Sequence, residues 1–326
     1  MYIPNAYFTY NNTSQLPVDK IISLRFKSTV YEPVNTLKVI FFTNEDFYSH
    51  VLQKFYCTFP NNIIFEGIID KLSYSQDRKL ITAECRSVTS LLVDNQVRPE
   101  QYTSINSETV YSRYLQPFAV TGITSFPNVT VHDFNVTPGQ TAWQAVTAFS
   151  KRAFDLKPHI DSAGKITVSP HFDTNPRIVL GSNNLPCSDV TYCNNRYNML
   201  SNIHFNISDS NFNANYSGNL VNPEINKYGY TKRRYVNFVN SWNNKDPRIT
   251  SQAIYERNID QHVFNVTLQD IHGIYPGQIV DLNHDINISP TTSSPYELYV
   301  GETEFLADNN GIRTNLKLYD LMQATY

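Results

Sequence analysis

Short runs of alternating apolar and polar residues, separated by polar turns, fill the first 95 positions of the chain. Alternation with a period of two, and short apolar runs bounded by turn residues, indicate β-strands. A hairpin with the polar tip Gln76-Asp77-Arg78 is expected, and residues 87–93 form a short helical turn suited to plugging one end. The pattern predicts a small barrel or barrel-like sandwich over residues 1–95. The expected strands are 22–26, 37–42, 51–59, 63–72 and 80–85.

Helical spacing replaces the alternation between residues 96 and 170. A first helix is expected to begin at Asn106-Ser107-Glu108 and to end at Pro117. A second is expected from Thr137-Pro138-Gly139-Gln140, which offers a capping residue, a proline at the first helical position and a capping-box glutamine. A hairpin over 156–170 completes a predicted small α/β module. The second helix carries one apolar stripe, formed by Ala142, Trp143, Val146, Phe149 and Ala153.

Residues 171–326 combine a weakly patterned stretch with a second set of strands. Positions from about 181 to 250 are rich in Asn, Ser and Tyr, which predicts a loop-rich insertion with a few exposed strands. Further along, Asn310-Gly311 between two apolar runs is a strong hairpin signal. The predicted fold is mainly β, with barrel-like β domains at 1–95 and 171–326 and the α/β module at 96–170 between them.

The composition supports this β-rich prediction. The chain has 22 Tyr and 19 Phe but only 11 Gly among 326 residues. Tyrosine and phenylalanine favour the pleated, half-buried surface of strands, and the abundant asparagines tolerate the left-handed geometry of turns.

Charge and hydropathy argue against two classes of partner. The net charge of −3 comes without a basic stripe, which disfavours nucleic-acid binding. The one basic cluster, Lys232, Arg233 and Arg234, is interpreted as a solvated face. No apolar run approaches the roughly 18 residues of a membrane span, and no signal-peptide pattern follows Met1. We therefore expect neither membrane insertion nor export.

The four cysteines predict free thiols in a reducing compartment. Cys57 and Cys85 lie in expected strands, where cysteine behaves as a small core residue, whereas Cys187 and Cys193 lie in an Asn-rich connection. No Cys-x-x-Cys spacing or neighbouring His pair supports zinc. No metal and no cofactor are therefore predicted.

Catalytic signatures are missing from the sequence. There is no nucleophile elbow, Walker loop, dinucleotide-binding glycine pattern or His-Glu-x-x-His. Residues 162–165 match Ser-x-x-Lys, but they lie in a predicted hairpin turn instead of at a helix start. A wall hydrolase would need paired carboxylates, and the spacing of the candidates selects none. No catalytic residue is predicted; the carboxylates considered are Glu66, Asp70, Asp281 and Asp285.

Aromatic residues crowd the polar insertion without a clear period. Exposed aromatics among polar residues mark protein or sugar interfaces, whereas local packing would make a small satellite core. Both interpretations stay open for these residues, while Trp143 is assigned to the core. The possible interface residues are Tyr228, Tyr230, Tyr235, Phe238 and Trp242.

The order of several weak motifs resembles the Mu-like baseplate hub family of contractile phage tails and phage-tail-like bacteriocins. The likeness covers most of residues 20–170 and 255–326. It includes a Phe-x-Gly-apolar strand, a strand followed by an Arg-Ser-x-x-x-Leu plug, a helix followed by Pro-Phe, and a capped second helix. The matching segments are 64–70, 81–94, 114–118, 138–146, 276–280 and 311–318.

This resemblance implies a structural protein and no enzyme. Hubs of this family are homotrimers in which each subunit contributes two similar barrels, so the ring adapts a sixfold tail tube to a threefold central spike. The implied partners are the spike protein, the tail tube protein or its initiator, and baseplate wedge proteins. The implied location is the baseplate of a virion or tail-like particle that is assembled in the bacterial cytoplasm.

Three other functions remain as alternatives. A receptor-binding or carbohydrate-binding tail protein would use the Asn- and Tyr-rich insertion as its contact surface. A tail-associated peptidoglycan hydrolase would need an active site that the motifs do not reveal. A capsid or spore-coat sandwich is disfavoured by the α/β module in the middle of the chain.

Overall fold

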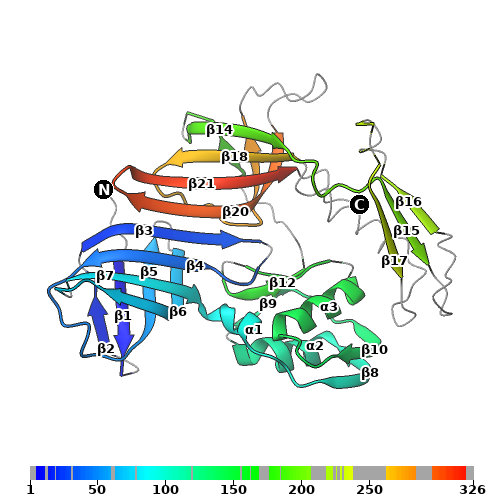
Figure 1. The fold of residues 1–326 in the computed structure, drawn as a ribbon, viewed down its shortest axis with the longest axis horizontal. Helices are drawn as coiled ribbons and strands as arrows, with labels where there is room; N and C mark the ends of the chain where they lie inside the picture. The colour runs from blue at the N-terminus through cyan, green and yellow to red at the C-terminus, as the bar shows by residue number, and fades with distance from the viewer. Residues whose placement is uncertain are drawn as a thin grey trace.

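The structure is a computed structural model of the chain. It describes residues 5–11, 14–18, 20–30, 32–59, 63–77, 79–118, 120–154, 156–161, 163–168, 176–183, 185–206, 218–222, 225, 228–229, 231–237, 262–283 and 296–320. Strands dominate this part of the chain, so the prediction of a mainly β fold with few helices is confirmed (Figure 1).

The N-terminal strands form a curled antiparallel sheet, in the order β3-β4-β7-β6-β5-β1-β2. Alternating burial along β7 places Ile81, Ala83 and Cys85 inside. The predicted hairpin is present as β6 and β7, and the predicted helical turn as η2 (Val88–Ser90) and α1 (Leu91–Asp94). Leu92 of this turn packs in the core of the α/β module and against α3 (Ala142–Phe154), so α1 does not plug the first barrel. The strands are β1 (Asn5–Tyr10), β2 (Ser14–Pro17), β3 (Lys20–Thr29), β4 (Thr36–Phe42), β5 (Leu52–Phe59), β6 (Ile63–Tyr74) and β7 (Leu80–Ser87).

The core of this first barrel is unusually aromatic. Phe8 is fully buried, and its ring centroid lies 4.7 Å from that of Phe55 and 5.5 Å from that of Phe47. At the other end, Phe26 stacks on Phe305 at 5.3 Å. Tilted and edge-on pairs at these distances stabilise a core beyond the burial of their area.

The middle of the chain forms a separate small module with its own core. Helix α3 (Ala142–Phe154) packs on β10 and on the preceding helical stretch, and buries Val146 and Phe149. The other elements are β8 (Glu100–Asn106), α2 (Ser107–Val110), η3 (Tyr111–Leu115), η4 (Gln116–Phe118), β9 (Gly122–Ser125), β10 (Thr130–Val136), β11 (His159–Ile160) and β12 (Lys165–Thr167).

The predicted start of the second helix is wrong by four residues. Gly139 has a φ of 87°, which belongs to the left-handed region and interrupts a right-handed helix. Helix α3 instead follows Thr141, whose backbone N–H donates to Gln144 Oε1 at 2.9 Å, while Gln144 N–H donates to Thr141 Oγ1 at 3.2 Å. This reciprocal pair is a capping box. The Thr-x-x-Gln motif that precedes it in the chain does not cap the helix. There the Thr137 backbone N–H donates to Gln140 Oε1, and this bond closes only the turn before the helix.

The C-terminal strands form the second curled sheet, with β19-β20-β21-β18-β14 as neighbours and β13 beside β19. Its core is aliphatic and includes Leu268, Val280, Val300 and Leu318. The predicted hairpin at Asn310-Gly311 is confirmed as β20 and β21. The strands are β13 (Ile178–Leu180), β14 (Cys187–Asn194), β18 (His262–Gln269), β19 (Ile279–Leu282), β20 (Tyr296–Asp308) and β21 (Gly311–Asp320).

The two curled sheets are one continuous sheet. The second half of β20 leaves β19 and pairs antiparallel with β3, from Glu302 opposite Thr29 to Ala307 opposite Leu24. This pairing, which the sequence pattern did not predict, produces a 13-stranded sheet that runs through both barrels (Figure 1).

A three-stranded sheet stands apart from both barrels, at the right of Figure 1. It consists of β15 (Asn202–Asn206), flanked by antiparallel β16 (Gly218–Val221) and parallel β17 (Arg233–Asn237). These are exposed strands of the kind predicted for the insertion. Strand β14, which also lies within 181–250, instead belongs to the large sheet. No helix of the described residues is long and apolar enough to cross a membrane.

Candidate functional site

The small sheet presents an exposed face of mixed aromatic, amide and basic side chains. Register places Val221, Asn202 and Arg233 in one row across the three strands, and Asn219, His204 and Tyr235 in the next. The imidazole of His204 stacks on Tyr235 with ring centroids 4.9 Å apart.

The opposite face of this sheet is only partly covered. Register places Leu220, Ile203 and Arg234 there. Ile203 is buried and Leu220 is half-buried, whereas Arg234 is exposed.

Two cation–π contacts fix the base of the small sheet. The guanidinium of Arg196 lies 3.6 Å from the ring centroid of Tyr228. The ammonium of Lys232 lies 5.4 Å from the ring of Tyr197 and donates to the Tyr197 carbonyl at 2.7 Å. Each cation therefore orders an aromatic ring of the same region.

The predicted interface residues fall partly within this region. Tyr235 is exposed on the open face, whereas Tyr228 is half-buried beneath Arg196. Tyr230, Phe238 and Trp242 lie outside the described residues.

The sequence reasoning missed Tyr197, which is 82 % exposed, and His204. His204 could have been found from the alternation of 202–206, but nothing in the pattern marks Tyr197. Of the basic cluster predicted to be solvated, Arg233 and Arg234 are exposed, whereas Lys232 is partly buried on Tyr197.

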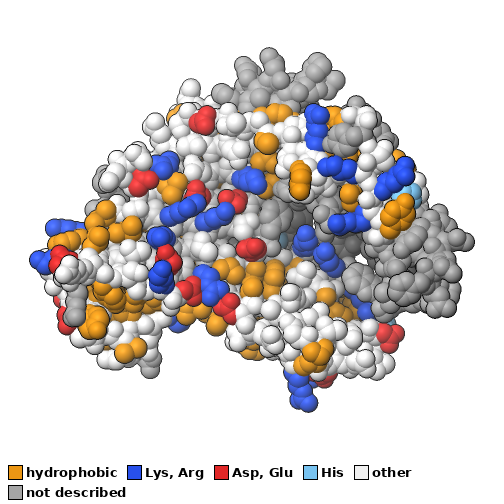
Figure 2. Space-filling view, in the orientation of Figure 1, with side chains coloured by type: hydrophobic (Ala, Val, Ile, Leu, Met, Phe, Trp, Pro, Cys, Tyr) orange, Lys and Arg blue, Asp and Glu red, His pale blue; other side chains and the backbone are white. Residues whose placement is uncertain are grey.

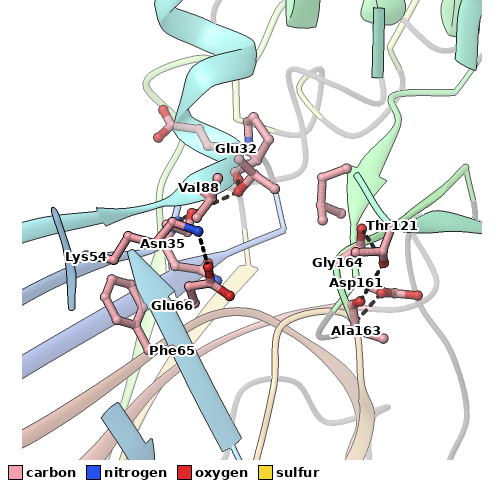
Figure 3. Close-up of a pocket in the computed structure, with 14 residues that line it drawn as sticks. Glu32, Asn35, Lys54, Phe65, Glu66, Val88, Thr121, Asp161, Ala163 and Gly164 are labelled. Carbon is pink, nitrogen blue, oxygen red and sulfur yellow. Dashed lines mark hydrogen bonds and ion pairs between the residues drawn. The ribbon is translucent and has the colours of Figure 1, made fainter. Parts of the chain in front are cut away.

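A cleft of about 310 Å³ separates the first barrel from the α/β module. Figure 3 shows Lys54, Phe65 and Glu66 on the barrel side, and Thr121 and the turn after Asp161 on the module side. Its remaining lining residues are Glu32, Pro33, Asn35, Ser87, Val88, Thr89, Ile160, Ala163 and Gly164.

The polar groups of the cleft are largely used by the protein itself. Lys54 Nζ donates to Glu66 Oε1 at 2.6 Å, and the Tyr56 hydroxyl donates to the same oxygen at 3.0 Å. Partial burial, followed by this contact with Glu66, raises the pKa of Tyr56 to about 12. Asp161 accepts from the backbone N–H groups of Ala163 and Lys165, and so closes its own turn. These side chains of the cleft are therefore bonded to other groups of the protein itself.

The carboxylates considered for hydrolysis are engaged in separate ion pairs. Glu66 binds Lys54, Asp70 binds Arg86 at 2.7 Å, and Asp281 binds Arg177 at 3.3 Å. Asp285 lies outside the described residues, as does Ser162 of the Ser-x-x-Lys match. The described turn after Asp161 confirms that this match is not at a helix start.

The cysteines are free, as predicted. Cys57 and Cys85 are buried, and burial raises the pKa of the Cys85 thiol to about 12, so it stays protonated. Cys187 is partly buried and Cys193 exposed, both on β14. Within the described residues, no group of His, Cys, Asp and Glu could hold a metal ion.

The seam between β3 and β20 joins the two barrels through side chains on both faces of the sheet. Phe26 and Phe305 stack across it on the inner side. On the outer side, Arg25 pairs with Glu304 at 2.6 Å and Lys27 with Glu302 at 3.0 Å. Figure 2 shows basic and acidic side chains mixed across the middle of the visible face.

A second cluster reinforces the seam at the end of β3. Val30 of the first barrel packs with Val263, Tyr299 and Tyr319 of the second. The Val30 backbone N–H also donates to the Gly301 carbonyl at 2.9 Å. The two barrels are therefore joined by ladder hydrogen bonds, ion pairs and buried side chains together.

Comparisons of sequence identify no relative, since no family model and no curated protein matches the chain. Comparisons of structure find similar proteins. A tail protein from Neisseria meningitidis superposes with a TM-score of 0.72 at 12 % identity, over 98 % of this chain and 96 % of its own. The 43 kDa tail protein of prophage MuSo2 from Shewanella oneidensis gives 0.70 at 14 % identity, over 98 % and 99 %.

The chain has the fold of phage tail proteins. A component of the type VI secretion system of E. coli, described as structurally similar to the T4 tail proteins gp27 and gp5, matches with a TM-score of 0.58 at 8 % identity. That match covers 95 % of this chain and 76 % of the other. The tail fold thus spans the whole chain, including both barrels and the module between them.

Proposed function

We propose that this protein is the structural hub of a tail baseplate, in a contractile phage tail or a tail-like particle. The observation that carries the proposal is the structural match over nearly the full length of two phage tail proteins. A match confined to one barrel would support only a shared module. Here the matches cover 98 % of this chain.

In the proposed assembly, three copies form a ring around the tail axis. Each copy supplies two curled sheets, so the ring has six quasi-equivalent positions toward the sixfold tail tube and three toward a central spike. The continuous sheet supports this arrangement, because β3 and β20 hold the two barrels of one copy in a fixed relation. The proposed partners are the spike protein, the tube protein or its initiator, and baseplate wedge proteins.

The proposed role is to adapt symmetry and transmit force, without catalysing a reaction. Force applied to one barrel would pass through the seam to the other, because the β3–β20 ladder and its ion pairs join the two barrels. Ion pairing of Glu66, Asp70 and Asp281 supports the non-catalytic assignment. The particle would be assembled in the bacterial cytoplasm and the protein would reside in its baseplate.

Light scattering after size exclusion tests the proposal. The protein is measured alone and with the spike protein of the same particle. A mass of three times 37.5 kDa, or a complex of three hub and three spike subunits, is expected. A chain that stays monomeric and does not bind the spike would overturn the assignment.

The second candidate is a receptor-binding or carbohydrate-binding tail protein. The exposed Tyr197 and Tyr235 favour it, because exposed aromatic rings can stack on sugars or on a protein partner. A glycan array separates the two candidates, since a hub should bind no sugar. A tail-associated peptidoglycan hydrolase would show clearing on cell-wall zymography, which we expect to be absent.

A further inference from the structure

We infer that the exposed face of the small sheet is a docking surface for a carboxylate-rich protein. This surface, called here the basic–aromatic face, consists of Asn202, His204, Asn219, Val221, Arg233 and Tyr235. The inference does not depend on the hub assignment, because it concerns the surface chemistry of one sheet.

The first observation is that large apolar and aromatic side chains are exposed to solvent on one face of the small sheet. Tyr235 is 57 % exposed and Val221 is 45 % exposed, on the same face of the sheet. The beginning of β17 lies beside them, where Arg233 is exposed as well. Tyrosine and arginine are enriched at the centres of protein interfaces, and both serve there as anchors.

The second observation is that the face is pre-ordered. His204 is stacked against Tyr235, and Asn202 Nδ2 donates to Asn219 Oδ1 at 3.2 Å in the neighbouring row. Side chains that are already held in one conformation lose less entropy on binding. The face therefore offers a rigid aromatic anchor beside fixed amide groups.

The third observation is charge, which selects the partner. Residues 195–237 contain five Lys or Arg and two Asp or Glu, so this segment has a net charge of +3, whereas the whole chain has −3. The remaining residues therefore carry −6. In the described part of this segment, Arg196, Lys232, Arg233 and Arg234 are present and no acidic residue is. In Figure 2, basic, histidine and apolar side chains gather at the place of the small sheet.

Electrostatic complementarity indicates an acidic partner. The negative remainder of the chain would repel a long polyanion that ran beyond the small sheet, which disfavours nucleic acid. A folded protein with a local group of carboxylates can touch this face alone.

Binding of the full-length chain to two labelled probes tests the inference: a short poly-glutamate that can lie on this face alone, and single-stranded DNA long enough to run beyond it. We expect poly-glutamate to bind at low ionic strength and to weaken as salt rises. Arg233→Glu should weaken this binding by roughly tenfold. Tyr235→Ala should weaken it by a smaller factor and leave the salt dependence unchanged, since no charge is lost.

The matched control is Arg98→Glu, which makes the same change in net charge at an exposed position of the α/β module. This variant should keep the binding of the unaltered protein, and circular dichroism should show all variants folded. The inference fails if poly-glutamate does not bind at low salt, if the Arg233 and Arg98 variants lose binding equally, or if the DNA binds more tightly. Each of these outcomes leaves the mass measurement of the proposed hub unaffected.

Discussion

Aromatic side chains have opposite roles in the first barrel and in the small sheet. In the barrel, Phe8 and Phe55 are fully buried and lie against each other with ring centroids 4.7 Å apart. In the small sheet, Tyr235 stacks on His204 with similar spacing, at 4.9 Å, but stays exposed. The difference teaches that ring contacts alone do not identify a core. The area removed from water distinguishes a ring that stabilises the fold from one that is available to a partner.

The largest loss of folding stability should come from truncating a buried aromatic side chain. Phe55→Ala is expected to lower the free energy of unfolding by about 3–5 kcal/mol, because it removes a buried side chain and leaves a cavity among neighbouring rings. Tyr235→Ala, the matched change in the small sheet, should alter it by only about 0.5 kcal/mol. Urea denaturation followed by circular dichroism measures both. Equal losses in the two variants would show that Tyr235 belongs to a core.

An intermediate effect is expected where the two barrels meet. A Cβ atom at Gly301 would overlap the ring of Tyr319, which is buried against Val30 and Tyr299. Gly301→Ala should therefore cost about 1–3 kcal/mol through overpacking.

Gly122→Ala is the control for this prediction. Its new Cβ would lie 3.7 Å from the side chain of Lys165, which is an ordinary contact. Thermal unfolding should show a lower midpoint for the Gly301 variant only. If the midpoint does not change in either variant, Tyr319 moves aside without cost, and the junction is looser than the buried packing indicates.

The sequence could predict the barrels but not their junction. Alternation within β4, β7 and β21 marks each strand, because one face of a strand meets the core. The pairing of β3 with β20 joins residues about 280 positions apart, and nothing local to either strand encodes it. From the sequence, Phe26 and Phe305 could each have been assigned to the core of its own barrel. That the two rings stack on each other could not have been predicted.

The start of helix α3 and the arrangement of the candidate site also could not be predicted from local sequence patterns alone. Two successive Thr-x-x-Gln motifs precede the apolar stripe, and only the backbone geometry at Gly139 decides that the second one caps the helix. For the site, composition indicated aromatic residues near 228–242. The face itself depends on register between β15 and β17, which brings His204 to Tyr235 across about 30 residues of chain.

The smallest loss of folding stability is expected when an ion-paired arginine, Arg86, is replaced, in comparison with the exposed Arg233. Arg86 donates to both Asp70 and Asp94, at 2.7 to 2.9 Å, and so ties β7 to β6 and to α1. All three side chains are about a third exposed, so solvent screening limits the contribution to roughly 1 kcal/mol for Arg86→Ala. Arg233→Ala, on the basic–aromatic face, should have no measurable effect on stability.

The stabilisation by Arg86 should also depend on pH in a defined direction. The hydrogen bonds from Arg86 lower the pKa of Asp94 below its usual value of 3.8. A lowered pKa in the folded state means that the contribution is complete above the unfolded value and is lost as pH falls through the folded value. The difference in unfolding free energy between the unaltered protein and Arg86→Ala should therefore be constant near neutral pH and shrink below about pH 4. Denaturation curves at several pH values measure it, and a difference that grew on acidification would mean that Arg86 is not stabilised by ionised Asp94.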